Sequence, residues 1–493
     1  MSKKVLVIGS GLGGICTAIR LAKAGYKVEI VEKYHQAGGR LNQLRKDGFI
    51  FDMAPTFFSM SYEFHRFAKE CAIDMPFRFV ELEPLYTVHF ENKPYSVTIY
   101  KDIDKLAAQF AAFEPDCKKK IERYLADAKA IFDATIDGVV HKNHTSAASF
   151  IRNMLVLPPW LLPLMFRSMW KHLDRYFSSP ELKIIMSLIA FFLGATPLET
   201  PAVYCLLNYV EMQHDGYYNV EGGMYKIVEG LLGEIQKRNI NIHYNTEILS
   251  YSSRTSFVDS FTDNHGKTWK ADIFVTNADA AWFRGAIMGR KAFSAKKLDN
   301  MNWTFAPFCI YAGIKGKIDQ LQQHNYFLGD KFVDYAKTIF RSSNISEHPY
   351  YYVNVPSRHN AGVAPEGCEA LFILCPVPDL RYKKEWTDRQ AFADILLNDL
   401  SVKLGIDIRK QLVSCSILDP QQWEKMFNLY RGSGLGLGHN ISQIAYFRPS
   451  NKDEKYNNLY YVGASTVPGT GLPMTIISSK LVTERILHEH SII

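Results

Sequence analysis

The sequence of 493 residues contains no apolar run as long as the roughly 20 residues that a membrane-spanning helix requires. The two longest candidates fall short. The 14 uncharged residues between Arg152 and Arg167 are interrupted by three prolines, and the 15 residues 184–198 run into proline and glutamate. We therefore predict that both are core or interfacial segments, and that the chain lies on a membrane surface without crossing it.

Cysteine is scattered rather than clustered. None of the eight cysteines forms a C-x-x-C pair, which argues against a zinc site or a disulfide framework, so we predict no metal. Met1 leads within a few residues into an apolar strand, which leaves no room for a signal peptide and predicts a cytoplasmic protein. Neither sign of charge dominates, because 57 Lys and Arg against 50 Asp and Glu give a formal net charge of only +7. Nucleic acid is therefore not expected as a partner.

The first thirty residues have the pattern of a strand, a glycine turn and a helix. Residues 4–8 (KVLVI) form a short apolar run that predicts a buried parallel strand, and GSGLGG follows at residues 9–14. Residues 15–24 have helical spacing, Gly25 is placed to end that helix, and a second strand is predicted over 26–31. This order matches the G-x-G-x-x-G fingerprint of dinucleotide sites, whose glycines allow a tight turn, a nearby pyrophosphate and close helix packing.

The residues after the second strand narrow the choice of dinucleotide. Glu32 ends that strand and can accept hydrogen bonds from ribose hydroxyls, and Gly38-Gly39-Arg40 follows five residues later. The guanidinium of Arg40 can fork onto phosphate oxygens. An acid followed by Gly-Gly-Arg resembles the double motif of FAD enzymes in the amine-oxidase and carotenoid-desaturase superfamily. The alternative is a solvated glycine turn with a surface arginine.

The far end of the chain carries a second glycine-lined helix start. A strand is predicted over 459–462, GASTVPGTGLP follows at 463–473, and a helix is predicted from Pro473 to about residue 487. Free amides near residues 472–474 favour negative charge on a bound group, such as the edge of a flavin that accepts a hydride. The alternative is a helix that simply closes the sheet.

Between these two ends the pattern changes. Residues 63–213 are predicted to be mostly helical and rich in aromatics, as a substrate chamber or lid, or as an ordinary helical core. Short strands over 241–244, 247–251 and 272–277, with a helix over 225–237, are predicted to extend the parallel sheet.

The predicted fold class is α/β, with a Rossmann-type FAD-binding domain, a mixed α/β substrate domain and a helical membrane-associated insertion. The FAD-binding domain is expected to combine residues 1–75, 218–285 and 425–493, and the substrate domain residues 76–217, which include the helical lid, and 286–424.

Taken in order, the motifs resemble those of the bacterial phytoene-desaturase type of carotenoid desaturases over essentially the whole chain. The series runs from GSGLGG and GGR through GFIFDMAPT, EGGMYKIVEGL and NADAAW to YFRP and NLYYVGASTVPGTGLPM. The resemblance implies an FAD enzyme that oxidises C–C to C=C bonds in isoprenoid chains by hydride transfer to the flavin. Two positions depart from the family pattern: Val467 replaces the histidine of Thr-His-Pro-Gly, and Ala54 replaces the glycine of Asp-x-Gly-Pro-Thr.

The resemblance also implies a set of site residues. No catalytic base can be named; Arg152 is one candidate, and the alternative is a surface arginine that flanks an interfacial segment. The predicted cofactor contacts are Gly9, Gly11, Leu12, Gly13, Gly14, Glu32, Lys33, Gly38, Gly39, Arg40, Ile248, Asn277, Gly463, Ala464, Gly471, Leu472, Pro473 and Met474.

Within the family, the resemblance points to the 1-hydroxycarotenoid 3,4-desaturase branch, and phytoene desaturase is the alternative. A related carotenoid isomerase, a flavin amine oxidase and a non-enzymatic prenyl-binding protein similar to the GDP-dissociation inhibitors rank behind these two. The expected partners are a carotenoid, quinone or dioxygen as electron acceptor, and the cytoplasmic membrane, where the protein is expected to be peripheral. Membrane contact is predicted through residues 155–166 and the basic run 118–120.

Overall fold

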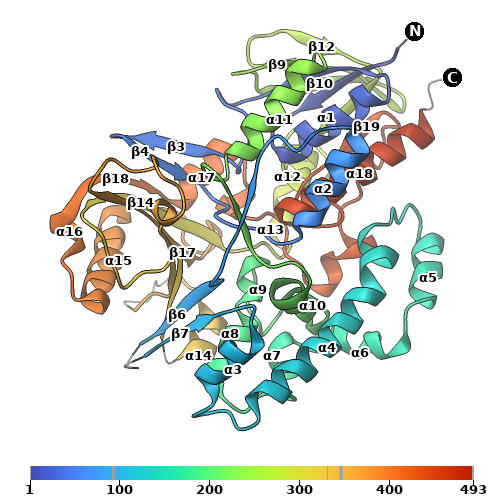
Figure 1. Cartoon of the computed structure of the whole chain (residues 1–493). Coiled ribbons are helices and arrows are strands. Elements are labelled where there is room, and N and C mark those ends of the chain that lie inside the picture. Colours follow the sequence, from blue (N-terminus) through green and yellow to red (C-terminus); the bar gives the residue numbers. More distant parts are fainter. Residues whose placement is uncertain (1, 92, 94, 330, 344–347, 491–493) are drawn as a thin grey trace.

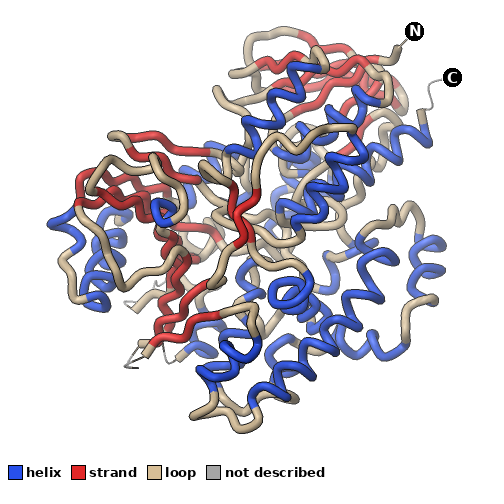
Figure 2. The backbone as a smooth tube through the Cα atoms, in the orientation of Figure 1, coloured by secondary structure: helices blue, strands red, loops and turns tan. Residues whose placement is uncertain are grey.

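The computed structural model describes residues 2–91, 93, 95–329, 331–343 and 348–490, and arranges them as two large sheets, three smaller ones and a block of helices (Figure 1). A five-stranded sheet lies at the upper right of the view, a seven-stranded sheet at the left, and helices at the lower right. Figure 2 shows the same division, with strands concentrated in the upper and left parts. The observed fold is mixed α/β, as predicted.

The five-stranded sheet is parallel throughout and has the order β19-β13-β1-β2-β9. Parallel strands of this kind are covered on both faces, which explains the nearly continuous apolar runs that identify them in the sequence. Neighbours in the sheet come from distant parts of the chain, since β1 pairs with both β2 and β13. The bounds are β1 (Lys4–Ile8), β2 (Lys27–Val31), β9 (Asn241–His243), β13 (Ile273–Thr276) and β19 (Leu459–Tyr461).

Helices cover this sheet, and α1 packs against both α11 and α18. The first helix begins earlier than expected, at Leu12, because Gly13 and Gly14 already adopt helical geometry. It ends before Gly25, whose φ of 91° lies in the left-handed region that glycine adopts without strain. The bounds are α1 (Leu12–Lys23), α2 (Ser61–Cys71), α11 (Lys226–Lys237), α12 (Ala280–Ala286) and α18 (Leu472–Glu489).

One strand that is expected in the parallel sheet lies elsewhere. The segment predicted over 247–251 is β10 (Ile248–Arg254), which pairs in antiparallel fashion with β11 (Phe257–Asp263). The two-residue connection, with Thr255 at φ 49°, makes a hairpin, and a hairpin cannot supply the crossover that parallel pairing needs. β12 (Thr268–Lys270) completes this separate three-stranded sheet.

The seven-stranded sheet has the order β18-β14-β17-β16-β15-β6-β7, and its two last strands come from the region predicted to be helical. β6 joins the sheet by parallel pairing with β15, which lies more than 200 residues further along the chain, so no local pattern reveals it. The bounds are β6 (Tyr86–Phe90), β7 (Ser96–Ile99), β14 (Ala306–Lys315), β15 (His324–Leu328), β16 (Tyr351–Asn354), β17 (Cys368–Val377) and β18 (Leu412–Leu418).

The helical block combines the 19-residue helix α4 with shorter helices, several of which begin at or beside a proline. It comprises α3 (Ile103–Phe110), α4 (Cys117–Thr135), η1 (Ile136–Val140), α5 (Ala147–Leu155), η2 (Pro159–Leu161), α6 (Leu162–Phe166), α7 (Met169–Leu173), α8 (Pro180–Ser187), α9 (Ile189–Phe192), η3 (Ala202–Cys205), α10 (Leu206–Tyr209) and η4 (Val210–His214). The remaining elements are β3 (Gln43–Lys46), β4 (Phe49–Asp52), β5 (Phe79–Glu81), β8 (Tyr218–Val220), η5 (Lys291–Phe293), α13 (Ala295–Asp299), α14 (Phe332–Thr338), η6 (Pro356–Arg358), α15 (Arg389–Leu404), α16 (Ile408–Gln411), α17 (Pro420–Phe427), η7 (Tyr430–Gly432), η8 (Ile441–Gln443) and η9 (Ala445–Phe447).

Candidate functional site

Two cavities meet at the start of α18. The first is lined by the glycine turn after β1, the end of β2, the loop 38–41 and the ends of β13 and β19. The second is lined by residues 54–60, the helical block, the seven-stranded sheet and residues 468–474. Leu472 lines both cavities. The two glycine-lined helix starts predicted from opposite ends of the chain therefore lie at one place.

Most predicted cofactor contacts line the first cavity. Gly14 lines neither cavity; a Cβ there would lie 2.1 Å from the Gly9 carbonyl oxygen, so this glycine allows the helix to pack on the strand. Gly471, Pro473 and Met474 line the second cavity. The contacts that line the first cavity are Gly9, Gly11, Leu12, Gly13, Glu32, Lys33, Gly38, Gly39, Arg40, Ile248, Asn277, Gly463, Ala464 and Leu472.

The two N-terminal glycine loops touch each other. Gly11 and Gly38 form a parallel β-bridge, and the Gly38 N–H donates to the Ser10 carbonyl at 2.8 Å. A Cβ on Gly11 would lie 2.5 Å from Asn277 Oδ1, and a Cβ on Gly39 would lie 3.3 Å from the Gly11 Cα. The bare backbone at these positions leaves room for a ligand to approach the main chain closely.

Both helices that start here present backbone amides to the site. The N-cap residues of α1 and α18 are Gly11 and Gly471, and neither helix start has a side-chain cap. An uncapped helix start leaves amides unpartnered and carries partial positive charge. Two such starts beside the partly buried guanidinium of Arg40 suit a diphosphate-containing group, so the residues present fit a dinucleotide cofactor.

Glu32 already has three donors from the protein. Its Oε2 accepts from the Ser10 N–H at 2.6 Å and the Ser10 hydroxyl at 2.7 Å, and its Oε1 accepts from the Tyr34 N–H at 2.8 Å. A carboxylate offers about four acceptor sites, so capacity remains for a ribose hydroxyl. These bonds fix the orientation of the carboxylate at the edge of the cavity.

Two cations flank the first cavity. Arg40 donates from Nη1 to the Gly434 carbonyl at 2.8 Å, and burial lowers its pKa, against the opposing effect of Asp279. Lys33 Nζ lies 3.1 Å from Glu247 Oε1 and is therefore partly neutralised. Arg40 is thus the cation better placed for a phosphate, since among the described residues its guanidinium bonds to a backbone carbonyl and forms no ion pair with a carboxylate.

The second cavity is large and apolar. It encloses about 400 Å³, and most of its wall is aromatic or aliphatic. Within the described part of the chain, none of its lining residues is Asp, Glu, Lys or Arg. Such a space suits an uncharged, elongated hydrocarbon rather than an ammonium or carboxylate group. Ala54, one of the two departures from the family pattern, lies in this wall.

His439 supplies an imidazole where the motif position 467 does not. It lines the second cavity, its Nε2 accepts from the Thr470 N–H at 3.2 Å, and a Cβ on Gly469 would lie 2.6 Å from that nitrogen. Burial and the nearby cation of Arg448 hold the pKa of His439 well below its usual value, so the ring is neutral. Sequence reasoning misses this residue because it belongs to a loop some thirty positions earlier.

Arg448, in the YFRP motif, anchors the loops around the site. It is 2% exposed, and burial lowers its pKa to about 10. Within the part of the chain that the structure describes, its guanidinium donates to the backbone carbonyls of Leu437, Gly438, Gln443, Ala464 and Thr466. The motif is visible in the sequence, but its role as a brace for the 437–443 and 464–466 segments depends on the tertiary fold.

A buried carboxyl lies behind the wall of the second cavity. Glu211 on η4 is 1% exposed, and burial raises its pKa from 4.5 to about 7, although the nearby hydroxyls of Tyr86 and Tyr217 and the amide of Asn208 act in the opposite direction. Tyr217 lines the cavity. Sequence reasoning gives Glu211 no role; the signal available is a single acid in the largely apolar stretch LLNYVEM.

Glu211 should make the stability of the protein fall as pH rises. Between pH 4.5 and about 7 the folded protein keeps a proton that the unfolded chain releases, so the free energy of unfolding decreases with pH. The decrease attributable to Glu211 should be on the order of 3 kcal/mol. Urea unfolding across this range should show a steeper loss for the wild type than for Glu211→Gln. The exposed Glu366→Gln control should retain the wild-type slope.

The structure does not bring Arg152 to the site. Arg152 is exposed on α5 and lines neither cavity, in keeping with the alternative of a surface arginine. It lies beside an apolar patch on α5, η2 and α6, at the right of Figure 1, which we define as Ile151, Leu155, Val156, Trp160, Leu162 and Phe166. No single helix among the described residues is long and apolar enough to span a membrane. One pair of helices, α5 and residues 159–166, has the length and composition together, but the two are bent by 107° relative to each other.

The structure does not bring all residues of the predicted membrane contact onto one surface. The basic run 118–120 lies in the first turn of α4, whereas Leu161 packs against Ile131 near the other end, roughly 20 Å away at the helical rise. Lys118 pairs with Asp104 at 2.5 Å, so its charge is largely matched. Leu161 is only 3% exposed and belongs to the core instead of the apolar patch.

Comparison with known proteins gives a family-level match. The sequence profile described as "Flavin containing amine oxidoreductase" matches residues 12–487. The zeta-carotene-forming phytoene desaturase of Myxococcus xanthus is 32% identical over 98% of this chain and 94% of its own length. The carotenoid 3,4-desaturase of Haloarcula japonica is 29% identical over 98% of both chains.

Among solved structures, an oxidoreductase from Methanosarcina mazei has a similar fold. The TM-score is 0.66 at 16% sequence identity, over 98% of this chain and 100% of the other. This likeness covers both sheets and the helical block, because nearly the whole of each chain is included.

Proposed function

Because this chain belongs to the flavin-containing amine oxidoreductase family, and within it to the carotenoid desaturases, we propose that it desaturates a hydroxylated carotenoid at the 3,4 position with FAD as its cofactor. The observation that carries the proposal is the meeting of a dinucleotide-type cavity and an uncharged apolar cavity at Leu472. A substrate in the second cavity would lie directly beside a group held in the first.

The chemistry that FAD supplies when bound is acceptance of a hydride from carbon. The chain contributes position and environment. The apolar wall of the second cavity aligns a molecule that has few polar handles and excludes water from it. The uncapped start of α18 stabilises negative charge that develops at the junction, and neutral His439 braces the turn before that helix through the Thr470 N–H.

A direct test uses the purified holoenzyme with a carotenoid in liposomes, without oxygen. The visible absorbance band of the flavin should decrease as the polyene gains a double bond, and pigment analysis should identify the product. A soluble amine that reduces the flavin in the absence of lipid, with no response to any carotenoid, would contradict the proposal.

Phytoene desaturase is the second candidate function. It is favoured by the names of relatives at 30% identity or more, among them the phytoene desaturase of Fusarium fujikuroi. Expression in cells that accumulate phytoene, or alternatively a 1-hydroxycarotenoid, separates the candidates by which pigment is consumed.

We also propose that the protein works as a peripheral protein on the cytoplasmic membrane, where carotenoids dissolve, and passes electrons to quinone or dioxygen. The apolar patch supports membrane contact, since five of its side chains are more than half exposed to solvent: Ile151, Leu155, Val156, Leu162 and Phe166.

A further inference from the structure

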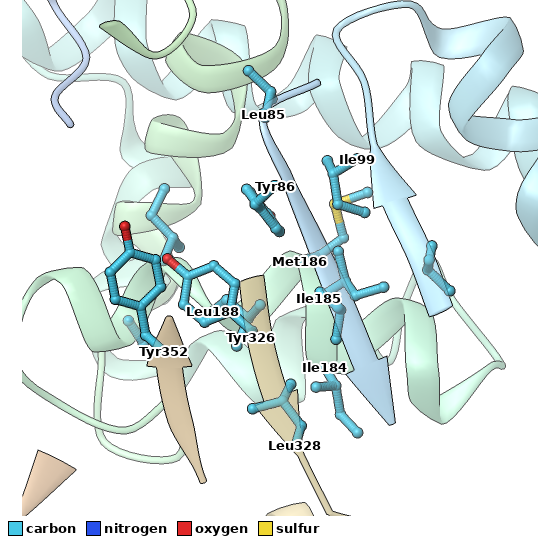
Figure 3. Close-up of a cluster of buried hydrophobic side chains, with 14 of the residues drawn as sticks. Leu85, Tyr86, Ile99, Ile184, Ile185, Met186, Leu188, Tyr326, Leu328 and Tyr352 are labelled. Carbon is cyan, nitrogen blue, oxygen red and sulfur yellow. The ribbon is translucent and has the colours of Figure 1, made fainter. Parts of the chain in front are cut away.

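One side of the second cavity is formed by tightly packed core. Leu188, Tyr326 and Tyr352 line the cavity and belong to a hydrophobic core cluster. Figure 3 shows these side chains among others from neighbouring strands and from the helical block. Protein interiors are packed as densely as organic crystals, so a long substrate cannot pass through them without unfolding the protein. A polyene is therefore expected to enter the cavity on another side.

Another side of the cavity is covered by a segment that has no buried residue. Residues 136–160 comprise η1, α5 and the turns next to them, and every one of them is at least partly exposed. The flanking Thr135 and Leu161 are only 7% and 3% exposed, so the segment is anchored at both ends. Val140, at the end of η1, lines the second cavity together with Met474 on α18. We call residues 136–160 the gate.

Polar contacts hold the gate against the rest of the protein. His141 Nε2 lies 3.0 Å from Glu63 Oε1 and 2.9 Å from Arg66 Nη1, so in either tautomer the ring has a hydrogen-bond partner on α2. Further along the gate, Asn143 Oδ1 accepts from Asn451 Nδ2 at 2.9 Å. A segment held by surface hydrogen bonds, without buried side chains of its own, can open while the core stays folded.

The outer face of the gate carries most of the apolar patch. Ile151, Leu155, Val156 and Trp160 belong to the gate, and they are 56%, 80%, 81% and 47% exposed. In Figure 1, α5 lies at the right-hand edge of the molecule, away from both large sheets. The part of the protein proposed to contact lipid and the cover of the second cavity are thus one segment.

Opening the gate would expose more apolar surface. The ring of Phe150 stacks on that of Tyr446 with centroids 5.4 Å apart, and its centroid is 5.8 Å from that of Phe447. These rings would separate, and Val140 would leave the cavity wall. An equilibrium shifts toward the state that a ligand binds better, and lipid binds better to the state with more exposed apolar surface. A membrane surface therefore favours the open gate, and water favours the closed one.

We propose that the gate is a lid over the second cavity, latched in water by the contact of His141 with Glu63 and Arg66, and opened when the apolar patch enters lipid. The polyene then passes from the membrane into the cavity without crossing water. This inference rests on the proposed function and on the membrane contact proposed with it. Between encounters with lipid, the closed gate keeps water out of the apolar cavity.

The first test closes the gate with a removable bridge. In the FAD-loaded double variant Asn143→Cys and Asn451→Cys, a short bis-methanethiosulfonate reagent joins the two thiols, and a reductant releases them. Quenching of tryptophan fluorescence, without oxygen, follows uptake of a 1-hydroxycarotenoid or of phytoene from liposomes. We expect the bridge to slow uptake at least about tenfold, and the reductant to restore it. Asn143→Cys alone, treated alike, controls for reaction at Cys368 and Cys415, which are partly exposed, and should not be slowed.

The second test removes the latch and serves if the double variant folds poorly. In water, the amides of residues 137–156 should exchange hydrogen about tenfold faster in His141→Ala than in the wild type, because a hydrogen bond to a charged group is lost. Adding liposomes to the wild type should have the same effect, and α4 should stay protected in both cases. His265→Ala is the control, since that exposed imidazole bonds to the Asn245 carbonyl at 3.0 Å, in the separate three-stranded sheet region.

Uptake that the bridge leaves unchanged, or gate amides that liposomes leave protected, would overturn the inference. If the wild type still takes up and desaturates a polyene in that case, only the gate is lost. If the FAD-loaded wild type takes up neither polyene, the proposed function is lost with it.

Discussion

Replacing Gly11 with alanine should give a folded protein that no longer retains FAD. The backbone of Gly11, at φ −67°, tolerates alanine, so the effect is steric. The new Cβ would lie 2.5 Å from Asn277 Oδ1, and Asn277 cannot move freely because its Nδ2 donates to the Val462 carbonyl at 3.0 Å. The methyl group would also occupy the approach to the uncapped start of α1. The dissociation constant for FAD should rise on the order of 100-fold, equivalent to about 2.7 kcal/mol.

The measurement is the flavin-to-protein ratio after purification, followed by titration of the apoprotein with FAD. Gly233→Ala is the control, since Gly233 lies on the exposed face of α11 and a Cβ there has no neighbour within 4 Å. That variant should be yellow and slightly more stable, because alanine favours a helix interior. Wild-type affinity for FAD in Gly11→Ala would show that the first cavity is not the cofactor site.

Serine at Leu155, Val156 and Phe166 together should abolish binding to liposomes. These side chains are 80%, 81% and 73% exposed, so their replacement removes surface contact without opening the core. Insertion of each apolar side chain into lipid contributes about 1.5–3 kcal/mol, so the triple variant should partition at least about 100-fold more weakly. Flotation through a density gradient, with both anionic and zwitterionic vesicles, measures the change.

The control for this experiment is the double variant Val402→Ser and Val413→Ser. These valines are 73% and 53% exposed but lie on α15 and β18, far from the apolar patch in Figure 1. Their replacement should leave flotation unchanged, and all the variants should keep bound FAD. A triple variant that floats like the wild type would remove the apolar patch from the membrane contact.

The elements of the parallel sheet could be predicted from sequence because their signals are local. KVLVI before a glycine turn, and a helix after it, need no knowledge of distant residues. β6 and β7 could not be predicted in this way, since β6 is held by pairing with β15 across more than 200 residues. The same holds for β10, whose place in a separate sheet depends on the hairpin at Thr255.

The residues of the candidate site also differ in whether local sequence motifs could identify them. Residues in glycine motifs, such as Gly11 and Leu472, could be assigned because the motif itself carries the chemistry. His439 and Glu211 could not be assigned in this way. The role of each depends on its burial and on contacts with residues that are distant in the sequence. The exposure of Leu162 and the burial of adjacent Leu161 likewise depend on how α6 rests on α4.

The order of strands in the parallel sheet bears on how the protein is made. The strand next to β13 is β19, and the helix that completes the first cavity, α18, ends at Glu489. A chain growing on the ribosome therefore displays β13 with a vacant edge until almost all of it has been synthesised, while the seven-stranded sheet can already assemble. Cofactor capture therefore requires that residues as late as α18 have been synthesised, and a premature stop before β19 would yield colourless protein prone to edge-to-edge association.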